Sequence, residues 1–149
     1  QTCALPIYYY CQPLLDNPPI VNTSSMQETH AALNERYGFG SFMAGQVTAD
    51  LRWAAVGTWK DKYEWAPLGP GSRRGMNRLL GRELDYPLRQ KQFEAELQCL
   101  IEACEKELPR SLAVKLEAMD YQNCLCEFDK YERTLWEGRR PKALYPGVE

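Results

Sequence analysis

The segment that most constrains the fold is LGPGSRRGMNRLLG, residues 68–81. Pro70 has no amide hydrogen and breaks the interior of a helix, while Gly69 and Gly71 can adopt backbone angles that other residues avoid. A helix therefore cannot continue through this segment. We predict a tight hairpin at the Gly-Pro-Gly sequence, followed by a short helix over 73–80.

The rest of the chain has helical patterns that glycine, proline and capping residues interrupt. Within residues 39–53, four apolar side chains are spaced for one buried helix face: Phe42, Met43, Val47 and Leu51. No segment has a convincing strand pattern, so we predict an all-α class. The expected helices lie within 23–38 (capped by Ser24 or Ser25 and ended by Gly38), 39–53 (capped by Ser41), 73–80, 86–108 (stopped by Pro109), 111–118 and 120–138 (capped by Asp120 and ended by Gly138).

The length of 149 residues suits one domain with a hydrophobic core. The first seven residues, QTCALPI, resemble a translated sequencing adapter, so we exclude 1–7 from the fold prediction. Residues 8–22 are proline-rich and expected to be irregular, and the basic tail after Gly138 is expected to be extended. We therefore expect one helical domain over 23–149 that is incomplete at its N-terminus.

Charge is distributed unevenly along the chain. The formal net charge is −2, which excludes a polybasic nucleic-acid binder. Residues 68–91 nevertheless hold six Arg or Lys against two acids, and 130–142 hold five against two, whereas 92–129 hold nine acids against three bases. The two basic segments can form one basic face after folding. The alternative is an ordinary solvated surface of mixed charge.

The six cysteines do not have the spacing of a metal site. Cys124 and Cys126 are separated by one residue instead of two, and the single histidine, His30, is distant in sequence. We expect no metal and reduced thiols in a cytoplasmic protein. No apolar run approaches the roughly 18 residues of a membrane span, so we expect no membrane partner.

The predicted hairpin precedes a helix N-terminus, where free amides and the helix dipole attract anions. Ser72, Arg73 and Arg74 follow directly. This layout resembles the helix-hairpin-helix element, which binds a DNA phosphate through its hairpin amides and carries no sequence information. The alternative is an ordinary turn between two helices, with glycines chosen for geometry alone.

Three blocks occur in one order: GFGSFMAGQVTADLRW (38–53), LGPGSRRGMNRLLGREL (68–84) and NCLCEFDKYERTLWEGRRPKALYPG (123–147). Together they resemble the alpha-glutamyl/putrescinyl thymine pyrophosphorylase family, the amino acid:DNA transferases of bacteriophage base-hypermodification systems. The third block is the most specific. The blocks cover most of the chain beyond residue 37.

The resemblance implies a helix-hairpin-helix DNA-glycosylase-like fold. It implies that the substrate is double-stranded DNA in which 5-hydroxymethyluracil has been pyrophosphorylated. It also implies a partner DNA kinase that modifies this base upstream in the pathway. An amino acid or a polyamine would displace pyrophosphate, with no metal or organic cofactor, in the cytoplasm of the host cell. Such chemistry requires a flipped base, a stabilised leaving group and a base that accepts the proton of the amine.

The candidate residues follow from these demands. We expect phosphate, either of the DNA backbone or of the pyrophosphate, to be bound by Gly69, Gly71, Ser72, Arg73, Arg74 and Arg78. The backbone is the preferred partner of the hairpin amides and Arg73. Lys130 and Arg133, three residues apart on the last predicted helix, are the candidates for the leaving group. For both sets the alternative is a solvated helix surface.

Asp129, in the EFDKYER sequence, is the first catalytic candidate because the resemblance implies an aspartate that follows the hairpin. Alternatively, Glu127 and Asp129 are surface charges that pair with Lys130 and Arg133 at helical spacing.

Gln46 and Asp50 are the second candidates, since a glutamine can bind the edge of a flipped uracil and an aspartate can act as base. Their alternative is polar packing. Nearby aromatic residues are candidates for stacking on the base or for the core: Trp53, Trp59, Tyr63 and Trp65.

Three other functions remain open from the sequence. A DNA glycosylase of the same fold would cut the base from its sugar, although GPGSRRG has no lysine for a lyase. A non-catalytic helical DNA-binding module would need no catalytic carboxylate. A truncated fragment would do nothing alone. The sequence does not identify the amine.

Overall fold

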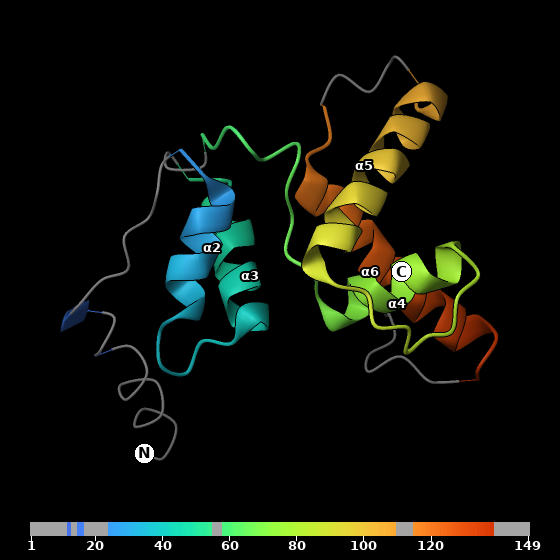
Figure 1. Ribbon diagram of the computed structural model, residues 1–149, viewed down its shortest axis with the longest axis horizontal. Coiled ribbons are helices and arrows are strands. Elements are labelled where there is room, and N and C mark those ends of the chain that lie inside the picture. The colour runs from blue at the N-terminus through green and yellow to red at the C-terminus, as the bar shows by residue number, and fades with distance from the viewer. Residues whose placement is uncertain (1–11, 13–14, 17–23, 55–57, 110–114, 139–149) are drawn as a thin grey trace, which may run out of the picture. The chain divides into compact units, whose positions relative to one another are not determined.

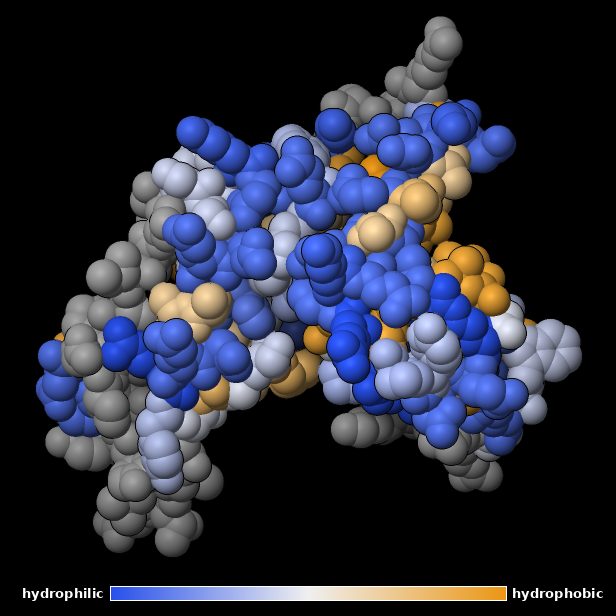
Figure 2. Space-filling model, viewed as in Figure 1, coloured by the Kyte–Doolittle hydropathy of each residue, from blue (hydrophilic) through white to orange (hydrophobic). Residues whose placement is uncertain are grey.

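The computed structural model describes residues 12, 15–16, 24–54, 58–109 and 115–138 (Figure 1). These ranges contain the helices α2 to α6 and no strand, so the predicted all-α class is confirmed. None of the helices in them is both long and apolar enough to cross a bilayer. Most of the surface visible in Figure 2 is hydrophilic, and hydrophobic side chains reach it in separate areas.

The chain divides into two compact units. The first unit comprises Gln1–Pro67 with Leu112–Met119, and the second comprises Leu68–Ser111 with Asp120–Glu149. Each unit has its own buried apolar residues: Met26, Leu33, Trp59 and Trp65 in the first, and Met76, Phe93, Leu97 and Leu125 in the second.

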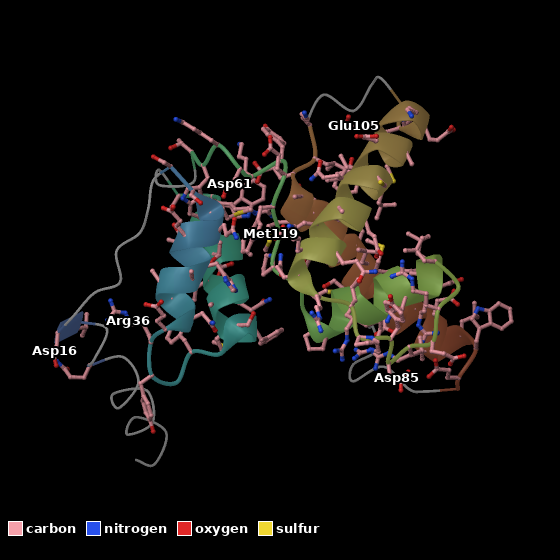
Figure 3. The ribbon with its side chains drawn as sticks, in the orientation of Figure 1. Asp16, Arg36, Asp61, Asp85, Glu105 and Met119 are labelled. Atoms are coloured by element: carbon pink, nitrogen blue, oxygen red, sulfur yellow. The ribbon has the colours of Figure 1, made fainter. Side chains whose placement is uncertain are left out.

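Helix α2, Met26–Asn34, begins where the sequence predicts. The Ser25 hydroxyl accepts a hydrogen bond from the backbone amide of Glu28 at 3.1 Å, so Ser25 is the N-cap. The Asp61 carboxylate accepts bonds from the Ser25 hydroxyl at 2.9 Å and the Met26 amide at 2.7 Å, and lies beside the start of α2 in Figure 3. A negative charge there also complements the helix dipole. The helix ends before Gly38, whose φ of 81° belongs to the following turn.

Helix α3, Ser41–Leu51, presents a different face to the core from the one predicted. Its buried residues are Ala44, Gly45 and Thr48, whereas Phe42 and Met43 are exposed. The buried face consists of small side chains, which let neighbouring segments approach α3 closely, and an added Cβ on Gly45 would lie 3.4 Å from Pro67. The predicted N-cap is also wrong, because Gly40 occupies that position and Ser41 is the first helical residue.

The second unit contains α4 (Pro70–Leu79), α5 (Gln90–Glu107) and α6 (Ala118–Leu135) from Asp120 onward. Helix α5 begins later than predicted because Arg89 is an extended N-cap with φ −97° and ψ 156°. It ends at Leu108, which is extended before Pro109, as expected for a residue that precedes proline.

Helix α6 begins before the predicted cap, so Asp120 lies in its first turn instead of capping it. The helix is over before Gly138, whose φ is 64°. A helix was predicted over 111–118, but residues 115–117 are not helical. Residues 111–114 of that prediction and the tail from 139 lie outside the described residues.

Candidate functional site

The Gly-Pro-Gly sequence forms the start of α4. Gly69 is the N-cap and Pro70 the first helical residue, a position where its fixed φ is favourable and its missing amide hydrogen costs nothing. The Ser72 hydroxyl accepts from the Gly69 amide at 3.0 Å and donates to the Gly69 carbonyl at 3.2 Å. Residues 58–69 contain no helix, so the hairpin predicted between two helices is wrong at this segment.

Two glycines of α4 lie against α6. A Cβ atom on Gly75 would stand 2.1 Å from the carbonyl oxygen of Leu125, and one on Gly71 would stand 3.0 Å from the Sγ of Cys126. Glycines four residues apart share one helix face. The spacing GSRRG therefore allows two helix backbones to approach closely. This close approach was not predicted from the sequence.

This close contact brings three arginines to one carboxylate. Asp129 of α6 is fully buried. Its carboxylate accepts from the Nε of Arg74 at 2.9 Å and of Arg78 at 3.0 Å, and the Nε of Arg133 lies 3.2 Å from it. We call Arg74, Arg78 and Arg133 the arginine cluster, with Asp129 as its centre.

The members of the cluster differ in their outer contacts. Arg78 also pairs with Glu137, and hydrogen bonding to Glu137 and then to Asp129 raises the pKa of its guanidinium above the ordinary value. Within the described ranges, Arg74 and Arg133 have no side-chain partner apart from Asp129. Their side chains remain 31% and 28% exposed. The cluster is thus a set of cations that the buried Asp129 carboxylate holds in place and that are partly open to solvent.

The other predicted residues of this unit lie outside the cluster. Lys130 pairs with Glu127 at 2.6 Å and is exposed, which is the surface pairing named as the alternative. Arg73 has a buried Nε without a hydrogen-bond partner in the described part of the chain. Ser72 is fully buried, and Gln122 also donates to its hydroxyl at 3.3 Å.

The remaining candidates belong to the first unit, which is described separately. Gln46 and Asp50 are both exposed on α3. Trp59 and Trp65 are buried core residues, whereas Trp53 is exposed. The roles predicted for all of these residues stay predictions.

No group of three His, Cys, Asp or Glu side chains arranged to hold a metal ion occurs within the described residues. The candidate site is therefore defined by its cations and their shared carboxylate. Fixed guanidinium groups of this kind bind anionic oxygens, most often phosphate or carboxylate.

A protein-family model described as "5-hmdU DNA kinase, helical domain" matches residues 14–139. The match includes every helix from α2 to α6 and all residues of the arginine cluster. No curated protein and no solved structure matches the chain.

Proposed function

The chain belongs to the family of 5-hmdU DNA kinase helical domains, and from this premise we propose that it holds the DNA substrate of such a kinase. Membership ties the chain to the modification of 5-hmdU in DNA. In our proposal the arginine cluster contacts the phosphate backbone.

The observation that carries this proposal is the buried Asp129 carboxylate with three arginine Nε atoms around it. A carboxylate that fixes several guanidinium groups reduces the entropy lost when they bind an anion. Arg74 and Arg133 retain donors for a second partner, and a phosphate accepts such forked contacts. Backbone contacts of this type position a duplex without reading its sequence.

Asp129 acts in this proposal as a positioning residue. Its burial and its three cationic neighbours support that role, since an approaching substrate would first meet the arginines. The catalytic role predicted for it from the sequence stays a prediction.

The kinase chemistry requires a nucleotide-phosphate site. The sequence contains no G-x-x-x-x-G-K-[ST] motif, the glycine-rich loop that commonly holds nucleotide phosphates. We assign DNA binding to this helical domain. The resemblance to the pyrophosphorylase family had implied the kinase as a separate upstream partner.

A second candidate function is the transferase that the three sequence blocks suggest. The chain would then displace pyrophosphate from pyrophosphorylated 5-hydroxymethyluracil with an amino acid or a polyamine. Nucleoside mass spectrometry after incubation with such DNA and mixed amines distinguishes the possibilities. An aminated thymidine supports the transferase, a released base supports a glycosylase, and unchanged nucleosides with intact DNA binding support the holding role.

Fluorescence anisotropy with a duplex that contains 5-hmdU tests the holding role. The double variant Arg74→Ala with Arg133→Ala should weaken binding and reduce the slope of log K against log salt by roughly 1.8, since each phosphate contact contributes about 0.9. Lys91→Ala, at an exposed position of the same unit, is the control for lost charge. If the double variant and the control have the same affinity and slope as the unaltered chain, the proposal is wrong.

A further inference from the structure

The C-terminal end of α6 exposes large apolar side chains. Trp136 is 73% exposed, and Leu135 and Tyr131 are also exposed. Burial of an aromatic side chain removes a large apolar area from water and often dominates the free energy of an interface. An exposed tryptophan at the end of a helix is therefore a candidate contact for a partner.

Trp136 is held in place by its neighbours in the chain. Its backbone amide donates to the Glu132 carbonyl at 2.9 Å, which continues the helical pattern. The next residue, Glu137, forms the ion pair with Arg78 of α4. The backbone on both sides of the indole is thus fixed to the same two helices that build the arginine cluster.

Trp136 also follows Arg133 by three residues. Side chains at this spacing are neighbours on the surface of a helix. Arg133 is bound to Asp129 through its Nε and remains partly exposed. The end of α6 therefore carries an exposed aromatic ring three residues after a guanidinium group that Asp129 holds.

We propose that Trp136 stacks on an unpaired nucleobase whose phosphate is bound by the arginine cluster. This inference rests on the proposed function, because it takes DNA as the partner of the cluster. Every nucleobase has a flat face that stacks on an aromatic ring, and positive charges next to such rings bind the backbone. The substrate class that follows is DNA with at least one unpaired nucleotide, in preference to an uninterrupted duplex whose bases stack on one another.

Affinities for a 12-nucleotide oligothymidylate and for a 12-base-pair duplex test the inference in the full chain. Trp136→Ala should weaken binding of the single strand about 5- to 150-fold, which corresponds to about 1–3 kcal/mol at 1.4 kcal/mol per tenfold change. Duplex affinity should change less than about twofold, since neighbouring base pairs cover the flat faces of the bases in a duplex. Trp136→Phe should restore most of the single-strand affinity.

Leu135→Ala is the matched control, because Leu135 is an exposed apolar neighbour without an aromatic ring. It should leave both affinities unchanged. The oligonucleotide should quench tryptophan emission in the unaltered chain, and this quenching should fall in Trp136→Phe. The salt dependence should be the same in all Trp136 variants, since no charge is altered.

The outcomes separate the two proposals. Duplex binding that depends on Arg74 and Arg133, together with single-strand binding unaffected by Trp136→Ala, overturns the stacking role alone. Absence of binding to either DNA overturns both proposals. Self-association of the chain that Trp136→Ala abolishes, with single-strand affinity unaltered, would identify a protein contact and also overturn the stacking role.

Discussion

Replacing Asp129 by asparagine removes the negative charge that contacts the guanidinium groups of three arginines. The three Nε atoms lie 2.9, 3.0 and 3.2 Å from the carboxylate oxygens. Hydrogen bonds to charged groups contribute about 1.5–3 kcal/mol each, and removal of one partner from a buried ion pair costs about 3–5 kcal/mol. The side chain of asparagine keeps one acceptor oxygen.

Arg74 and Arg78 donate hydrogen bonds to the carboxylate, whereas Arg133 forms an ion pair with it and donates to the Asp129 backbone carbonyl. The expected loss in the free energy of unfolding is smaller than the sum of these interactions. Arg74 and Arg133 are partly exposed and can regain water, so part of the cost is offset. We expect Asp129→Asn to lower the free energy of unfolding by about 2–4 kcal/mol. Against a typical total of about 5–15 kcal/mol, this is a large share.

Urea denaturation followed by circular dichroism measures this loss. Glu127→Gln is the control, since it makes the same charge change two residues earlier on α6, at an exposed side chain paired with Lys130 alone among the described residues. An exposed ion pair contributes about 0–1 kcal/mol, so the control should change stability by less than about 1 kcal/mol. Equal, small losses in both variants would refute the view that Asp129 holds α4 against α6.

Two other substitutions and one titration extend these expectations. Gly75→Ala should lower stability by at least about 3 kcal/mol or prevent folding, because the added Cβ meets the Leu125 carbonyl oxygen at 2.1 Å, and a near-native urea midpoint would contradict the close helix contact. Gly45→Ala is its control and should be neutral or stabilising, since the new Cβ would make an ordinary 3.4 Å contact inside a helix. Burial lowers the pKa of His30 below its ordinary value of about 6.5, so the folded state favours the neutral ring. The free energy of unfolding should therefore be fully retained above about pH 6.5 and fall as the pH drops below it; urea midpoints from pH 7.5 to 5.5 should show this fall in the unaltered chain and less of it in His30→Gln.

Local features of the sequence predicted the local features of the fold. The Ser25 cap and the stop before Pro109 depend on residues within one helical turn, so a single segment contains the whole signal. The buried face of α3 was not predictable in this way. Phe42 and Met43 have the right spacing, but the small residues of another face are buried instead, with Gly45 against Pro67.

The arginine cluster depends on contacts between distant segments. Asp129 is 55 residues from Arg74 and 51 from Arg78. The i,i+4 spacing on the last helix did indicate the pair of Asp129 with Arg133, which was given as an alternative and is present in the structure. No local pattern indicates that Arg74 and Arg78 meet the same carboxylate. The signal that was present lay in the glycines at 71 and 75, whose spacing permits the close approach of α4 and α6.

The functional class was predicted at the level of the modified base. The family match confirms the link to 5-hmdU DNA, and the family it names is the helical domain of a kinase. The pyrophosphorylase resemblance rests on sequence blocks that include GPGSRRG and EFDKYER. In the structure these two blocks supply the glycine contact and the arginine cluster, which are shared by both proposed functions.

The contact between Gly71 and Cys126 makes one thiol a reporter of helix separation. The Sγ of Cys126 lies where even an added methyl group on Gly71 would be crowded, and burial raises the pKa of this thiol. Cys126 is partly buried against Gly71, so an alkylating reagent should modify it more slowly than Cys124, which is exposed two residues earlier and provides an internal reference. The ratio of the Cys126 rate to the Cys124 rate should rise when the helices separate in the native state, and a bound DNA that fixes both helices should lower that ratio.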